Sequence, residues 1–324
     1  MVKYLNKIIF IVVLFFLTGC SDTSKQGIGE SDEMKAAQIA LSAGDYEKAY
    51  ELYSEADKKY TDPLAQFTLG NFFHSGWGRA ADPPAACTWF GKAAQGGIPF
   101  AQHLFGECLE KGVHQKADPV MAAHWYVEAA KGGHAVSNCH LSGLYMSGVG
   151  VDKNPKKALE LCSAATSNST MAMLWMGRFY LEGDASIRNN ALAWLWFKQA
   201  AEYRLSEGFY YLGLMLEKGL VEDSSAEAAL GMYQQAAEKG ITMAYYPTGK
   251  LYFESRRNPE SDLPVAEDLA EAYMWLMAAK RKVEDEVELN SAKALLQELL
   301  KIMPETWMKE LDERVDKHLN ENHS

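Results

Sequence analysis

The sequence lacks the short motifs by which several classes of enzyme are recognised. It contains no SxxK, GxSxG, HExxH or CxxC pattern, and no nucleophile and base at a spacing typical of a catalytic pair. It also lacks a long apolar run: the ten residues 8–17 are too few to cross a bilayer as a mature helix, and are typical of the core of a signal peptide. We therefore predict that the chain is not an enzyme.

Basic residues are scarce. Lysine and arginine total 32 against 43 aspartates and glutamates, which gives a formal net charge of −11 at pH 7. Removal of residues 1–19 takes away Lys3 and Lys7 and no acid, so the charge becomes −13. A chain with this acid excess and no basic patch is a poor candidate for binding nucleic acid or anionic lipid. We expect no nucleic-acid partner, and any membrane attachment must come from acyl chains.

The eight histidines lack the spacing of a metal site, although six of them fall between His74 and His140. No two form an i, i+4 pair. His103 occupies an apolar-stripe position, and His114 and His134 lie where turns are expected. We predict no metal site and no cofactor.

What the sequence does have is a repeat of about 36 residues. A small residue, preceded by an apolar one in the first five copies and by Thr248 in the sixth, recurs six times at spacings of 36, 36, 35, 36 and 36 residues. It falls at Gly70, Gly106, Ser142, Gly177, Gly213 and Gly249. A pair of small residues recurs as well, at Ala93-Ala94, Ala129-Ala130, Ala164-Ala165, Ala200-Ala201, Ala236-Ala237 and Ala278-Ala279. Periods of this length indicate a solenoid of helical hairpins.

Each repeat encodes two helices and the turn between them. Around Gly70, apolar residues at positions −3, −1, +2 and +3 form one buried stripe of a first helix. Gly76 suits the left-handed conformation that commonly ends a helix. The second helix begins at Asp82-Pro83, where the carboxylate caps free N–H groups and proline suits the first position. The aromatic pair Trp89-Phe90 is expected to fill the space between repeats.

The whole pattern, LGxxYxxGxGVxxDxxKAxxWYxKAAxxG, resembles that of Sel1-like repeats, relatives of the tetratricopeptide repeat. Residues 141–158, LSGLYMSGVGVDKNPKKA, follow its first part closely. In that repeat Ser142 replaces a glycine, and Glu160-Leu161 stands where the aromatic pair is expected. The resemblance covers residues 65–280 and implies an all-α, right-handed superhelical solenoid of about seven antiparallel helix hairpins, with a concave face that binds a protein or peptide.

We expect the solenoid to occupy residues 31–282 as one elongated domain, because a repeat array grows without a central core. Residues 283–303 and 304–318 have the pattern of two amphipathic helices, separated by Pro304. An array needs an end unit that covers its last apolar face. Residues 283–324 are therefore predicted to be capping helices.

Residues 1–19 predict a lipoprotein signal peptide. Leu17-Thr18-Gly19-Cys20 resembles the bacterial lipobox, whose cysteine becomes the first residue of the mature protein and carries the lipid. Ser21, which is not an aspartate, implies transfer to the outer membrane by the same resemblance. Residues 20–30 are polar and predict a flexible tether. We expect a lipid-anchored protein of the bacterial envelope that faces the periplasm; the alternative is an ordinary signal peptide with an incidental cysteine.

Four cysteines remain after Cys20, in a compartment where disulfides persist. Their places at facing ends of antiparallel helices favour the pairs Cys87–Cys108 and Cys139–Cys162. Each pair closes a loop of just over twenty residues, which contributes about 3 kcal/mol. The alternative is that all four are small buried core residues.

The resemblance predicts an interaction scaffold, since proteins similar to this one act as adaptors in the bacterial envelope. Two other classes stay open. Some secreted, cysteine-rich members of the family are described as binding or slowly hydrolysing β-lactams, and a structural contact with peptidoglycan is the third possibility. The sequence singles out no binding residue.

Overall fold

The computed structural model describes residues 32–167, 169–255, 257–258 and 263–321. Within these ranges it contains sixteen α-helices, two short 3-10 helices and no β-strand. The all-α prediction is confirmed. Of the described helices, none is both long enough and apolar enough to cross a bilayer.

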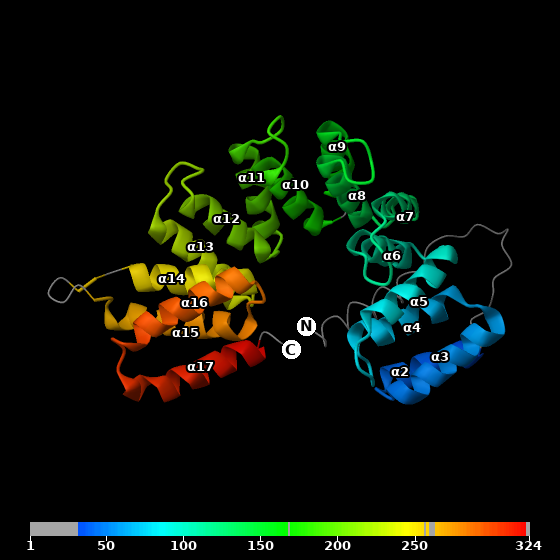
Figure 1. Cartoon of the computed structure of the whole chain (residues 1–324), viewed down its shortest axis with the longest axis horizontal. Coiled ribbons are helices and arrows are strands. Elements are labelled where there is room, and N and C mark those ends of the chain that lie inside the picture. The colour runs from blue at the N-terminus through cyan, green and yellow to red at the C-terminus, as the bar shows by residue number, and fades with distance from the viewer. Residues whose placement is uncertain (1–31, 168, 256, 259–262, 322–324) are drawn as a thin grey trace. The chain divides into compact units, whose positions relative to one another are not determined.

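Seven helical hairpins follow one another along the chain, in the order of the colours in Figure 1. The paired helices are α2 (Asp32–Ser42) and α3 (Tyr46–Tyr60), α4 (Pro63–Ser75) and α5 (Pro83–Gln95), α6 (Pro99–Lys111) and α7 (Pro119–Lys131), α8 (Val136–Ser147) and α9 (Pro155–Ala165), α10 (Thr170–Glu182) and α11 (Asn190–Glu202), α12 (Glu207–Glu217) and α13 (Ala226–Glu238), and α14 (Tyr245–Glu254) and α15 (Ala266–Lys282). Two further helices, α16 (Glu286–Leu300) and α17 (Met308–Glu321), follow the last hairpin.

The predicted start and stop signals are confirmed in the helix ends. Gly76, Gly112 and Gly148 end α4, α6 and α8 with φ of 69°, 68° and 77°. The second helices begin with a capping side chain and a proline, as expected. The side chains of Asp82, Asp118 and Asn154 accept hydrogen bonds of 3.0 Å from the backbone N–H groups of Ala85, Met121 and Lys157. Each hairpin is thus bounded by its own local sequence.

A glycine in the first helix and a large side chain in the second close five of the seven described hairpins. A Cβ on Gly70 would lie 2.5 Å from Cε1 of Phe90, so only glycine leaves room for this ring. The sequence places such rings between repeats, whereas Phe90 lies first against the glycine of its own hairpin and then beside Ala101 and Cys108 of the next. The same contact joins Gly106 to Tyr126, Gly177 to Phe197, Gly213 to Tyr233 and Gly249 to Leu276.

This contact predicts opposite effects for one substitution at two glycines. Gly70→Ala is expected to lower the free energy of unfolding by about 1–3 kcal/mol, because the buried Phe90 ring must move. Gly231→Ala, in the exposed middle of α13 with nothing within 4 Å, is expected to raise it by about 0.5–1 kcal/mol. Urea titrations of both variants measure the difference, and equal effects would refute this account of the packing.

The α8–α9 hairpin departs from this rule, and by a different residue from the one that the sequence pattern indicates. The residue that corresponds to Phe90 and Tyr126 is Cys162, since it lies four residues after a fully buried alanine, Ala158, as Tyr126 lies four after Ala122. The pair that corresponds to Trp89-Phe90 is therefore Leu161-Cys162, one residue later than the predicted pair Glu160-Leu161. This repeat is one residue shorter than the others, and the residue is missing at the end of α9. Helix α9 has 11 residues, whereas α5 and α7 have 13.

By their contacts, the described residues group into two compact units, where the sequence predicts one elongated domain. The N-terminal unit contains the described residues up to Trp175 together with Gly183–Ile187, and the C-terminal unit contains Met176–Glu182 and the described residues from Arg188 onward. Helix α10 contributes to both.

Helices α16 and α17 cover the apolar surface of the last hairpin. Leu296 and Leu299 of α16 and Val315 of α17 are buried in one cluster with Trp275 and other residues of α15. His318 of α17 lies with its ring centroid 4.9 Å from that of Trp275 and its Nε2 3.2 Å from the Tyr245 hydroxyl. These contacts are those that a terminal cap requires.

Candidate functional site

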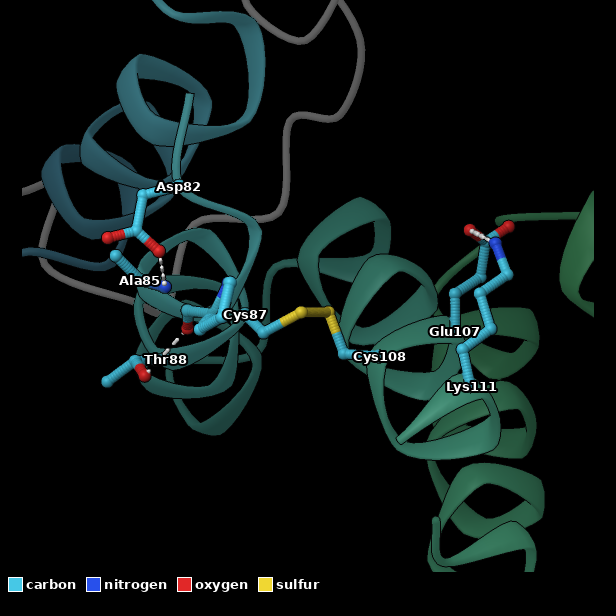
Figure 2. The surroundings of a disulfide bond; sticks show 8 residues. Asp82, Ala85, Cys87, Thr88, Glu107, Cys108 and Lys111 are labelled. Carbon is cyan, nitrogen blue, oxygen red and sulfur yellow. Dashed lines mark hydrogen bonds and ion pairs between the residues drawn. A yellow bond between two sulfur atoms is a disulfide. The ribbon is translucent and has the colours of Figure 1, made fainter. Parts of the chain in front are cut away.

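Two disulfides tie neighbouring helices of the N-terminal unit. Cys87 of α5 and Cys108 of α6 join the α4–α5 and α6–α7 hairpins, with a Cα–Cα distance of 5.8 Å (Figure 2). Cys139 and Cys162 both lie in the α8–α9 hairpin, with a Cα–Cα distance of 4.4 Å. The structure thus brings together both pairs that the sequence favours. The predicted signal peptide, residues 1–19, and the predicted tether, residues 20–30 with Cys20, lie outside the described residues.

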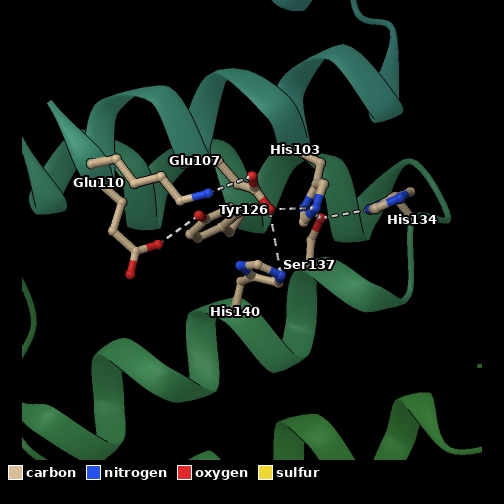
Figure 3. Close-up of polar contacts among 8 residues, drawn as sticks. His103, Glu107, Glu110, Tyr126, His134, Ser137 and His140 are labelled. Carbon is tan, nitrogen blue, oxygen red and sulfur yellow. Dashed lines mark hydrogen bonds and ion pairs between the residues drawn. The ribbon is translucent and has the colours of Figure 1, made fainter. Parts of the chain in front are cut away.

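A cluster of histidines and one carboxylate lies between α6 and α8, on the side of α6 away from Cys108 (Figures 2 and 3). His103 and Glu107 are four residues apart on α6, and their Nε2 and Oε1 atoms are 3.5 Å apart. His140 of α8 places its Nε2 3.7 Å from the same Oε1. His103 and Glu107 share one face of α6, because residues at i and i+4 lie on the same side of a helix. His140 approaches that face from α8, so the three side chains converge on one point.

A fourth polar group, the Ser137 hydroxyl, supports the cluster from the start of α8. Its Oγ lies 3.0 Å from Nδ1 of His103 and 2.8 Å from Nδ1 of His134. His134 reaches this place because α7 ends just before it and Gly133 takes a φ of 95°. The His103 and His134 ring centroids are 4.4 Å apart.

Aromatic rings enclose the cluster. The Tyr126 ring lies 5.7 Å from His103 and 5.3 Å from His140, measured between centroids, and the Trp175 ring lies 5.1 Å from His140. The side chain of His103 is 7% exposed, that of His140 19% and that of Glu107 26%. The site is therefore largely buried but open on the Glu107 side.

The surroundings lower the pKa values of Glu107, His134 and His140. The His103 ring, and after it the Lys111 ammonium 3.1 Å away, lower the pKa of Glu107 to about 2, against the opposing effect of burial. Burial, reinforced by proximity to His103, lowers the pKa of His134 and of His140 to about 4. At neutral pH the site thus holds one carboxylate beside two uncharged imidazoles.

The repeat pattern matches a known family along more than half of the chain. The profile described as Sel1 repeat matches residues 40–56, 63–98, 99–134, 135–169, 170–202 and 207–241. The chain belongs to the Sel1 repeat family. Sel1 repeat proteins are generally scaffolds for protein–protein interaction and not enzymes.

Solved Sel1 structures share this fold. A Sel1 repeat protein from Oxalobacter formigenes is 26% identical, with a TM-score of 0.61, and the match covers 79% of this chain and 99% of that one. A protective antigen of uropathogenic Escherichia coli strains is 21% identical, with a TM-score of 0.62; the match covers 90% of this chain and 61% of that chain's length. A comparison with curated proteins finds no match. The predicted fold class, a solenoid of antiparallel hairpins, is confirmed.

The Sel1 repeat also explains why the sequence did not indicate the histidine cluster. His103 and His140 lie in successive repeats, 37 residues apart in the chain, and His134 lies at a turn as expected. The prediction of no metal site rested on spacing within one helix. The usable signal was the pair His103 and Glu107 at i, i+4, combined with a period that places His140 beside it.

Glu107 and His140 of the cluster belong to a longer row of residues that we call the first-helix face. In each Sel1 hairpin it consists of the residues two before, one after and five after the repeat glycine position. In the N-terminal unit these are Thr68, Asn71, Ser75, Leu104, Glu107, Lys111, His140, Gly143, Ser147 and Trp175, all at least partly exposed except Asn71. This face carries polar, charged and aromatic groups together, which suits recognition of a protein surface.

Proposed function

We propose that this Sel1 repeat protein is a lipid-anchored interaction scaffold of the bacterial envelope, and that it holds a protein or peptide partner on its first-helix face. The observation that carries the proposal is that face. Its Leu104, His140 and Trp175 side chains stay partly exposed while the residues beside them form the core. Stacked repeats present such a surface over a long distance, and repeat proteins use it for binding.

The anchor is proposed from the chain's start and from its disulfides. Cys20 follows Leu-Thr-Gly, and residues 21–30 are polar, so an acylated Cys20 would hold the repeats to a membrane through a flexible tether. Two disulfides suit an oxidising compartment such as the periplasm. Ser21 favours the outer membrane, with the repeats facing the periplasm.

Site-specific photo-crosslinking in living cells tests both parts of the proposal. A photoreactive residue at Ser147, on the first-helix face, is expected to crosslink one dominant protein. The same residue at Glu160, exposed on the second helix of that hairpin, is the matched control and is expected to give none. Cys20→Ala with an ordinary cleavable signal peptide is expected to move the protein from the membrane to the soluble fraction and to weaken the crosslink.

The outcomes separate the two parts. Equal crosslinking from Ser147 and Glu160 would contradict the first-helix face as the binding surface, whatever the location. Retention of the Cys20→Ala variant in the membrane fraction would contradict the lipid anchor. Turnover of nitrocefin by the pure protein would favour the β-lactam alternative, and sedimentation with isolated cell wall would favour a peptidoglycan contact.

A further inference from the structure

We propose that His103, Glu107 and His140 form a Zn²⁺ site that joins the α6–α7 and α8–α9 hairpins. Their three ligand atoms all lie within 4.8 Å of one another. The two imidazole Nε2 atoms lie 3.5 and 3.7 Å from the same carboxylate oxygen. In a tetrahedral zinc site with bonds of about 2.0–2.1 Å, neighbouring ligand atoms are roughly 3.3 Å apart. A small inward movement of the side chains is enough to coordinate the ion.

The ligands stand on regular helices, which fix their positions. His103 and Glu107 project from one face of α6, and His140 projects toward them from α8 (Figure 3). Both helices belong to the N-terminal unit. An ion bound here crosslinks two successive repeats without any change in the path of the backbone, and ligands held in this way lose little freedom on binding.

The Ser137 hydroxyl supplies the hydrogen bond that a zinc-binding histidine needs. One hydroxyl has one proton, so Ser137 donates to Nδ1 of one histidine and accepts from Nδ1–H of the other. When His103 donates and His134 accepts, the lone pair on Nε2 of His103 faces Glu107 and the metal. In the opposite arrangement that Nε2 carries the proton and donates toward Glu107. Zinc binding therefore requires rotation of this hydroxyl together with a change of tautomer at both imidazoles, in which Nε2 of His103 releases its proton to water, Nδ1 of His103 becomes protonated, and the proton of His134 moves from Nδ1 to Nε2 by exchange with water.

Glu107 is oriented in a similar way. Lys111 lies 3.1 Å from Oε2, which leaves Oε1 directed at the two imidazoles. The surrounding Tyr126 and Trp175 rings limit the access of water. The 26% exposure of the Glu107 side chain leaves an entry path for the ion.

The set of ligands favours zinc over Mg²⁺ and Ca²⁺. Two imidazole nitrogens and one carboxylate oxygen suit zinc, whereas Mg²⁺ and Ca²⁺ prefer all-oxygen ligands. Three protein ligands leave the fourth position to water or to a group of a bound molecule. The inference depends neither on the lipid anchor nor on a partner.

Zinc binding by the full mature chain tests the site. The protein carries no histidine tag, keeps both disulfides and has Cys20→Ser so that no free thiol binds metal. After treatment with EDTA, titration calorimetry is expected to show one Zn²⁺ per chain and no binding of Mg²⁺. Glu107→Gln and His140→Gln are each expected to weaken zinc binding by at least about tenfold. His124→Gln, which changes an exposed histidine of α7 outside the cluster, is the matched control and is expected to bind as the parent does.

Circular dichroism checks that each variant is folded, and Co²⁺ gives an independent readout on the parent protein. A tetrahedral site is expected to give intense d–d absorption that one equivalent of Zn²⁺ abolishes, and Zn²⁺ is expected to raise the Tm of the parent but not of a folded ligand variant. Failure of the parent chain to bind a stoichiometric Zn²⁺ overturns the proposal. So does zinc binding by Glu107→Gln and His140→Gln with the parent's affinity.

Discussion

Replacing Phe197 with alanine is expected to lower the free energy of unfolding by about 3–5 kcal/mol. The ring is fully buried, lies against Gly177 of the same hairpin and stacks on Tyr211, with 4.6 Å between the ring centroids. Glycine provides no side chain to fill the cavity, and a helix cannot collapse around a missing ring. The loss therefore includes both the transfer of the ring and the cavity left behind.

Leu195→Ala, in the same helix α11, is the control for this prediction. Its side chain is 47% exposed, so its removal is expected to change the free energy by no more than about 0.5 kcal/mol. Urea unfolding followed by far-UV circular dichroism gives the midpoint and the slope for each variant. A Phe197→Ala protein with the same midpoint as Leu195→Ala would contradict the glycine–ring contact as a main source of stability.

Removing the disulfide of the α8–α9 hairpin, by Cys139→Ala with Cys162→Ala, is expected to lower the free energy of unfolding by about 3 kcal/mol. The bridge closes a loop with a sequence separation of 23 residues. It also stands where other hairpins have the glycine–ring contact, since Ser142 and Cys162 replace the two partners. The variant is therefore expected to unfold at a lower urea concentration than the parent.

A variant that restores the repeat pattern separates these two effects. Ser142→Gly and Cys162→Phe, with Cys139→Leu, give the α8–α9 hairpin the residue types found at Gly177, Phe197 and Leu174. Under reducing conditions this protein is expected to be more stable than the reduced parent. If the two unfold at the same urea concentration, the disulfide does not take the place of the contact.

The sequence was sufficient for those features of the fold that depend on neighbours in the chain. Asp82, Asp118 and Asn154 cap helices because capping requires only the three residues that follow. The positions of Gly76 and its equivalents mark helix ends for the same local reason. The repeat period then supplied the hairpin order, because each unit repeats the same signals.

The alignment of residues between repeats, and the contacts between helices of different repeats, were harder to predict. The pair Ala164-Ala165 looked like Ala93-Ala94, yet burial shows that Ala165 corresponds to Ala93, because the shortened α9 had moved the register by one. The histidine cluster was missed for a related reason. Its side chains come from two repeats, and no pattern within one repeat describes the contact between them.

The glycine–ring contacts also bear on how the chain folds. In four hairpins the two partners are always twenty residues apart, as at positions 70 and 90, 106 and 126, 177 and 197, and 213 and 233. Closing such short loops costs little chain entropy, and topologies dominated by near neighbours form quickly. Folding can therefore nucleate in whichever hairpin closes first and spread to its neighbours, so that gain or loss of a whole repeat during evolution leaves the folding of the others intact.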